Sequence, residues 1–118
     1  MAANPLPAPT LRLSTEKSPA ESVVRCSGKV TLETADELRQ AARELLTESQ
    51  RVVLDFTGVT YLDSSGLGTI IGLMLTSKKS GRQLKLINLT PRVREIFTLT
   101  RLAEALEGHE EYLGLTPD

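Results

Sequence analysis

Hydrophobic and polar residues follow one another along the chain in patterns that predict four strands. Residues 10–15 (TLRLST) alternate between apolar and polar, and residues 22–28 (SVVRCSG) predict a second short strand. Residues 51–56 (RVVLDF) form a β-branched apolar run of the kind found in strands buried on both faces. Residues 83–89 (QLKLINL) predict the fourth strand.

A first helix is predicted where apolar residues recur at helical spacing and charged residues occupy the other side. The apolar positions are Ala35, Leu38, Ala41, Ala42, Leu45 and Leu46. Two starting points are open for this helix. Thr31 can act as its N-cap, or Thr34 can form a capping box with Glu37.

Two more helices complete the pattern. After a loop at residues 57–65, a second helix runs to about Lys79, and Gly81 is placed to end it. Thr90 and Pro91 predict an N-cap followed by proline at the first position of a third helix. The third helix ends near residues 100–105, and residues 109–118 (HEEYLGLTPD) are compatible with a short strand, a helix remnant or a frayed end.

The order of these elements predicts an α/β fold, because strand–helix–strand repeats favour a mostly parallel sheet with right-handed crossovers. We expect a mixed, mostly parallel sheet of four to five strands with about three to four helices packed on it. A chain of 118 residues forms one core. Residues 11–118 are therefore assigned to a single domain, and residues 1–10, with three prolines and three alanines, to a flexible tail.

Composition narrows the function. With 14 Lys and Arg against 15 Asp and Glu, the net charge is −1, so no basic excess points to nucleic acid. The single Cys26 permits no internal disulfide, which fits a reducing compartment. The N-terminus lacks the features of a secretory signal, and no apolar run approaches the roughly 18 residues of a membrane span. We expect a cytoplasmic protein with no stable membrane insertion.

The most specific signal lies between the third strand and the second helix, where residues 63–68 read DSSGLG. Serines at a helix start cap exposed backbone N–H groups, and the glycines leave the serine hydroxyls uncovered. The partial positive charge of a helix N-terminus tolerates a phosphate. The pattern fits either a simple helix cap or a hydroxyl that a kinase can phosphorylate.

This segment resembles the sulfate transporter and anti-sigma factor antagonist (STAS) domain in its free-standing bacterial form. The matching stretches are VVLDFTGVTYLDSSGLGTIIG at residues 52–72, a turn at Gly28 before a helix with Thr34-Ala35 and Leu38, and LKLINLTPRVREIFTLTRL at residues 84–102. Together they span most of residues 22–106. The resemblance implies a single STAS-like domain.

In that family, the serine after the aspartate is phosphorylated by an anti-sigma factor that is also a serine kinase. By resemblance that serine is Ser64. The unphosphorylated protein would bind the anti-sigma factor and free a sigma factor, and a protein phosphatase would reverse the modification. The resemblance places partner contacts at Asp63, Ser65, Gly66, Leu67 and Thr31, with no cofactor, no metal and no catalytic residue.

One turn departs from the family pattern. Many antagonists carry Gly-Glu-Leu-Asp after the second strand, whereas this chain has Gly28-Lys29-Val30-Thr31. Both acids are missing, so any contact with a partner or metal that depends on them is in doubt. The sequence leaves open whether Ser65 or Thr31 is also modified.

The sequence gives little support to an enzymatic function. The only histidine, His109, lies in the weakly patterned tail, and the Gly-x-Ser-x-Gly elbow of serine hydrolases is missing. The spacing of Gly66, Gly68 and Gly72 does not match a dinucleotide fingerprint, so we expect these glycines to allow close helix packing. A second function class is a STAS subunit of another assembly, such as a stress-signalling scaffold or a lipid or anion transport complex.

Overall fold

A computed structural model describes residues 11–99 of the chain, without the side chain of residue 99. These residues form seven elements that alternate as the sequence predicts. In chain order they are β1 (Leu11–Glu16), β2 (Glu21–Val30), α1 (Ala35–Leu46), β3 (Arg51–Leu62), α2 (Ser64–Lys79), β4 (Gln83–Ile87) and α3 (Pro91–Leu99).

The four strands form one mixed sheet in the order β1-β2-β3-β4. β1 and β2 are an antiparallel hairpin, whereas β2, β3 and β4 run parallel. Each parallel step is made through a helix, as such connections require. The predicted α/β class with a mostly parallel sheet is therefore confirmed, with four strands and three helices among residues 11–99.

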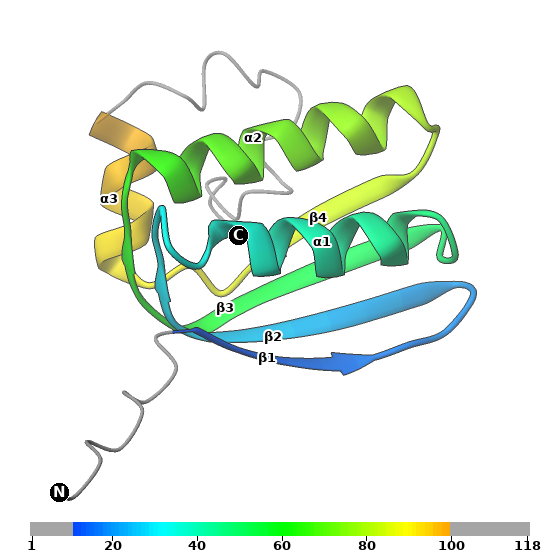
Figure 1. Ribbon diagram of the computed structural model, residues 1–118, viewed down its shortest axis with the longest axis horizontal. Helices are drawn as coiled ribbons and strands as arrows, with labels where there is room; N and C mark the ends of the chain where they lie inside the picture. Colours follow the sequence, from blue (N-terminus) through cyan, green and yellow to red (C-terminus); the bar gives the residue numbers. More distant parts are fainter. Residues whose placement is uncertain (1–10, 100–118) are drawn as a thin grey trace, which may run out of the picture.

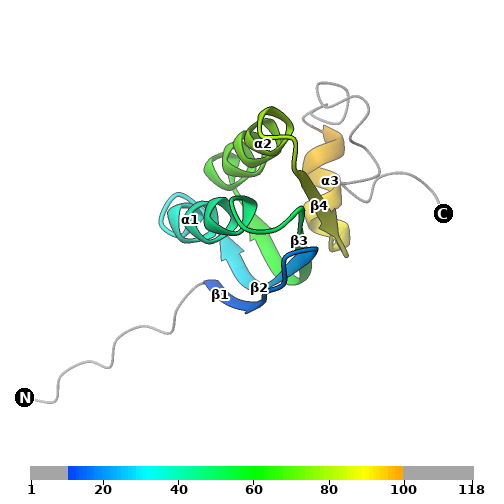
Figure 2. The same ribbon diagram turned by 90° about the vertical axis from the view of Figure 1, so that its right-hand side faces the viewer.

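Helices α1 and α2 lie side by side over one face of the sheet, and α3 stands at the end of the sheet where α2 begins (Figures 1 and 2). Apolar side chains from the sheet and from all three helices form the hydrophobic core. Its largest fully buried members are Phe56, Phe97, Leu38, Leu54, Ile70, Leu73 and Leu86. No helix among residues 11–99 is long and apolar enough to cross a membrane.

β3 is twice as long as the sequence pattern predicts, because it continues from Phe56 to Leu62 through the predicted loop. Pairing with β2 drives this extension, since Gly58 lies opposite Ser27 and Leu62 lies opposite Val30. The two strands lie very close together at this point, since a Cβ added to Gly58 would lie 2.9 Å from the Cβ of Ser27. Only Asp63 then separates the end of β3 from the start of α2.

The helix ends confirm some of the predicted caps. Pro91 is the first residue of α3, and Gly81, at φ +71°, follows the C-cap Ser80 of α2. The prediction of Thr31 as the N-cap of α1 is wrong. The carbonyl oxygen of Thr31 accepts hydrogen bonds from the Thr34 and Ala35 N–H groups, so a turn precedes the helix.

Thr34 occupies the N-cap position of α1, but its side chain makes no capping hydrogen bond and the predicted capping box does not form. The Thr34 hydroxyl instead donates to the Lys29 carbonyl oxygen at 2.8 Å and accepts from the Thr31 N–H at 2.9 Å. It therefore folds the β2–α1 turn rather than capping the helix.

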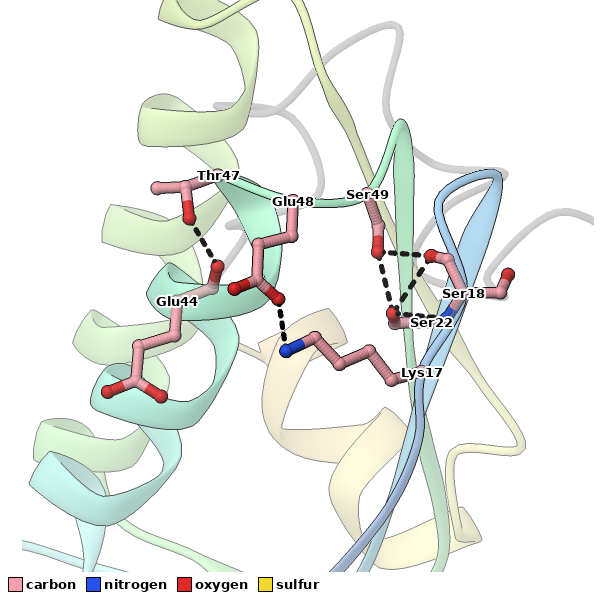
Figure 3. Close-up of polar contacts among 7 residues, drawn as sticks. All are labelled: Lys17, Ser18, Ser22, Glu44, Thr47, Glu48 and Ser49. Carbon is pink, nitrogen blue, oxygen red and sulfur yellow. Dashed lines mark hydrogen bonds and ion pairs between the residues drawn. The ribbon is translucent and has the colours of Figure 1, made fainter.

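A cluster of serines joins the β1–β2 turn to the α1–β3 turn, at the end of the sheet away from the start of α2 (Figure 3). Ser22 and Ser49 are fully buried, and their hydroxyl oxygens lie 2.6 Å apart. The Ser49 hydroxyl also donates to the Ser18 carbonyl oxygen at 2.6 Å. Since each hydroxyl has one hydrogen, Ser22 is left to donate to Ser49. An ion pair between Lys17 and Glu48 lies beside the cluster.

This cluster predicts a coupled loss of stability. Ser49→Ala should lower the free energy of unfolding by about 1–3 kcal/mol, because it leaves the buried Ser22 hydroxyl without its best acceptor. The double variant Ser22→Ala/Ser49→Ala should lose less than the sum of the two single variants. Urea unfolding measures all three, with the exposed Ser14→Ala as the control. Strictly additive losses would show that the two hydroxyls act independently.

Candidate functional site

Ser64 is the first residue of α2, and its side chain is exposed. The helix begins directly at the carboxyl end of a parallel strand, where backbone N–H groups point outward and the helix dipole is positive. No acidic residue occupies the first turn of α2. Among the residues that the structure describes, none forms a hydrogen bond with the Ser64 hydroxyl. The hydroxyl is therefore accessible to another protein.

Asp63 precedes Ser64 and caps α2. One oxygen of its carboxylate, Oδ1, accepts a hydrogen bond from the Gly66 N–H at 2.9 Å. The other oxygen, Oδ2, accepts from the Leu32 N–H at 3.0 Å, in the β2–α1 turn. The Asp63 N–H in turn donates to the Val30 carbonyl oxygen at 3.2 Å. One residue thus ties the start of α2 to the turn before α1.

These bonds also fix the charge of Asp63. The hydrogen bond from the Gly66 N–H is the main cause that lowers the pKa of the Asp63 carboxyl below its usual range. Burial is the second-largest cause and acts in the opposite direction, while the Leu32 and Ser65 N–H groups act with Gly66, so the pKa is lowered overall. Asp63 is therefore a carboxylate at neutral pH, next to the Ser64 hydroxyl.

Gly66 explains why the first turn of α2 lies so close to the sheet. A Cβ at this position would stand 2.3 Å from the Val30 carbonyl oxygen and 2.7 Å from Cδ1 of Leu62. Any side chain would push the helix start away from the end of β2. The expectation of close packing does not hold for Gly68 or Gly72, because a Cβ on either would meet nothing within 4 Å.

The other predicted site residues differ in how deeply they are buried. Leu67 is 6% exposed and belongs to the hydrophobic core, and Gly66 is buried against β2, so both face the domain rather than solvent. Ser65 is half-buried and lies in a groove between α1 and α2. Thr31 is half-buried in the β2–α1 turn. The structure brings Thr31 and Asp63 together at one surface.

That surface includes residues that the sequence pattern does not single out. A groove of about 610 Å³, named here the Tyr61 groove, is lined by Lys29, Thr31, Leu32, Glu33, Thr60, Tyr61, Asp63 and Arg92. Leu32 is 75% exposed and Tyr61 is 39% exposed. The Arg92 guanidinium, from α3, lies 6.0 Å from the centre of the Tyr61 ring. The apolar Leu32 between polar turn residues is the one sequence signal that could have indicated this groove.

Other reactive groups lie away from Ser64. Burial raises the pKa of the Cys26 thiol to about 12, and Asp55 adds to the effect, so this cysteine stays protonated. Burial would raise the pKa of Asp55, but hydrogen bonds from Thr57 and Asn88 and the charge of Arg25 lower it overall. No group of three or more His, Cys, Asp or Glu side chains that could hold a metal occurs among residues 11–99. His109 lies outside the described residues.

Sequence comparison places this geometry in a known family. Residues 13–110 match the family model described as Mlab, STAS domain. The anti-sigma-B factor antagonist of Bacillus subtilis (strain 168) is 31% identical over 84 residues, which cover 71% of this chain and 77% of that protein.

Solved structures agree with the sequence match. An anti-sigma factor antagonist from Mycobacterium paratuberculosis superposes with a TM-score of 0.71 at 26% identity, over 85% of this chain and 86% of that one. The unphosphorylated form of the anti-sigma factor antagonist SpoIIAA has a TM-score of 0.68 at 19% identity, covering 90% of this chain and 100% of its own. The phosphorylated form of SpoIIAA from Bacillus has a TM-score of 0.64 at 20% identity, covering 79% and 86%. The chain belongs to the STAS domain family and, within it, to the anti-sigma factor antagonists.

Proposed function

We propose that this chain is a non-enzymatic switch that binds an anti-sigma factor while Ser64 is unphosphorylated and releases it after phosphorylation. Binding would keep the anti-sigma factor away from its sigma factor. The observation that supports this most directly is the exposed Ser64 hydroxyl at the first position of α2, beside the capping carboxylate of Asp63. The anti-sigma factor itself would be the serine kinase, and a protein phosphatase would restore the free hydroxyl.

The chemistry of the switch needs no catalytic group on this chain. A phosphate on Ser64 adds about −1.5 to −2 charges and three acceptor oxygens. Its position at a helix N-terminus lets the folded domain tolerate that charge. In a contact surface, however, the phosphate must lose water and sits next to the Asp63 carboxylate. A loss of about 2.7 kcal/mol of binding free energy weakens binding roughly a hundredfold. Repulsion of one charge in the contact can cause a loss of this size.

The surroundings of Ser64 favour a local switch over a change of fold. Asp63 joins α2 to the β2–α1 turn through two hydrogen bonds, at 2.9 and 3.0 Å. Gly66 lets the helix start press against the end of β2. A surface held on both sides in this way is already ordered before a partner arrives, so little conformational entropy is lost on binding. The phosphate would then act through charge and shape at the contact.

The first prediction from this function concerns Ser64. Ser64→Ala should take up no phosphate from the cognate anti-sigma factor kinase and should stay bound to it in the presence of ATP. Ser80→Ala is the matched control, since it removes an exposed hydroxyl at the other end of α2 and should be phosphorylated like wild type. Phosphate incorporation and co-elution on gel filtration measure the two effects. Equal phosphate uptake by Ser64→Ala and wild type would reject the site.

The second prediction concerns Asp63. Asp63→Ala should lower the free energy of unfolding near neutral pH by about 1 kcal/mol, because α2 loses its N-cap. The folded-state pKa of Asp63 is lowered, so its contribution is present above the unfolded-state pKa and is lost as pH falls through the folded-state pKa. The gap between wild type and variant should therefore close in acid.

Urea unfolding across this pH range measures the gap. Asp36→Ala is the control, because Asp36 is an exposed carboxylate near the start of α1 whose pairing with Arg39 stays within one helix. Asp63→Ala should also bind the anti-sigma factor more weakly, since the β2–α1 turn is no longer tied to α2. A stability gap that does not change with pH would contradict the role given to the carboxylate.

A further inference from the structure

Thr34 and Asp63 bind the same short stretch of the β2–α1 turn. The stretch consists of two peptide groups, one between Val30 and Thr31 and the next between Thr31 and Leu32. Their two N–H groups and two C=O groups all form hydrogen bonds, and each of the four groups bonds to Thr34 or to Asp63. The turn before α1 is therefore held between these two residues.

The first peptide group is bound at both of its ends. Its N–H, from Thr31, donates to the Thr34 hydroxyl at 2.9 Å, and its C=O, from Val30, accepts from the Asp63 N–H at 3.2 Å. The Thr34 hydroxyl uses its one hydrogen to donate to the Lys29 carbonyl oxygen at 2.8 Å. Since Thr34 is 5% exposed, little water reaches this hydroxyl to replace either bond.

The second peptide group is bound in the same way. Its C=O, from Thr31, accepts from the Thr34 N–H at 3.0 Å, and its N–H, from Leu32, donates to Oδ2 of Asp63 at 3.0 Å. The described residues contain no cis peptide bond, and in a trans peptide the C=O and N–H groups point in opposite directions. The bonds on the Thr34 side therefore direct the Leu32 N–H toward Asp63.

Asp63 transmits this arrangement to the start of α2. The second oxygen of its carboxylate, Oδ1, accepts from the Gly66 N–H at 2.9 Å, in the first turn of the helix that begins at Ser64. A shift of the β2–α1 turn would therefore shift the Asp63 carboxylate and the residue next to it. Phosphate transfer is sensitive to such shifts, because a reacting group displaced by about 1 Å can react roughly a hundredfold more slowly.

We propose that Thr34 is a positioning residue for the Ser64 switch. Its hydroxyl, acting through the two peptide groups and Asp63, fixes the place at which the Ser64 hydroxyl meets the kinase. The inference rests on the proposed function, because the kinase is taken to be the anti-sigma factor that phosphorylates Ser64.

The serine cluster at the opposite end of the sheet supplies a control for a purely structural effect. Ser22 and Ser49 are also buried and also hydrogen-bonded, but they join turns at the end of the sheet away from the start of α2 (Figure 3). Loss of a bond in this cluster lowers the stability of the domain without a direct contact to Asp63. Ser49→Ala therefore separates lower stability from lost positioning.

Phosphorylation of Ser64 in a single turnover, with the kinase at saturating concentration, tests the role of Thr34. Thr34→Val keeps the β-branched shape but removes the hydroxyl, and it should slow phosphorylation at least about tenfold. Thr34→Ser keeps the hydroxyl and should stay within about twofold of wild type, as should Ser49→Ala. Equal rates for Thr34→Val and wild type would overturn the inference and leave the proposed function standing. No phosphate on Ser64 of the wild type would overturn both.

A double variant tests whether Thr34 acts through Asp63. If it does, Thr34→Val should slow phosphorylation about threefold at most when it is added to Asp63→Ala, because the two changes break one chain of contacts. A full tenfold loss in the Asp63→Ala background would show that Thr34 acts by another route, and would overturn the inference.

Amide hydrogen exchange tests the same contacts in the wild-type chain, so it does not depend on the folding of any variant. The Leu32 side chain is 75% exposed, yet its N–H bonds to Asp63 and should exchange at least about tenfold more slowly than in an unfolded chain. Folded Thr34→Val should lose this protection, and Ser49→Ala should keep it. An unprotected Leu32 amide in the wild type would overturn the inference.

Discussion

The two hydrogen bonds accepted by the Asp63 carboxylate determine the shape of the surface around Ser64. One bond fixes the first turn of α2 and the other holds the β2–α1 turn at Leu32, 31 residues earlier in the chain. The Asp63 N–H adds a third link, to the carbonyl of Val30 at the end of β2. Without this arrangement, the hydroxyl of Ser64 and the walls of the Tyr61 groove would not keep a fixed relation to one another.

The sheet behind this surface explains why such short links suffice. β2 and β3 run parallel and end together, with Val30 opposite Leu62, so the segments that follow both strands start at the same edge. α1 and α2 then return over the same face (Figure 1). Gly66 allows the closest approach at this edge, where any Cβ would collide with backbone. The parallel pairing of β2 and β3 therefore brings the two segments of the site together, and Asp63 and Gly66 fix how closely they lie.

Local patterns predicted the elements well because each depends on neighbours in sequence. The helical spacing of Leu38, Ala42 and Leu45, and the starting position of Pro91, follow from such patterns. The extension of β3 through Gly58 could not be predicted, since its turn-forming residues are held extended by pairing with β2. The same limit applies to Thr34, whose hydroxyl bonds to Lys29 in the turn rather than to the helix.

In the candidate site, too, features that depend on neighbours in sequence could be predicted, and features that join distant segments could not. The DSSGLG run located Ser64 and Asp63, because a helix start after a buried strand is a local feature. The Tyr61 groove joins Lys29, Tyr61 and Arg92 from three elements, and no spacing in the sequence relates them. Burial also separates residues that look alike in the motif, since Ser64 is exposed while Leu67 belongs to the core.

We propose that a phosphate on Ser64 changes the fit of a preformed surface with its partner. The most direct measurement compares, by titration calorimetry, the affinity of one anti-sigma factor for the unmodified wild-type chain and for the chain phosphorylated on Ser64. We expect the phosphorylated chain to bind at least about a hundredfold more weakly, with the fold unchanged. Equal affinities for the two forms would contradict the account.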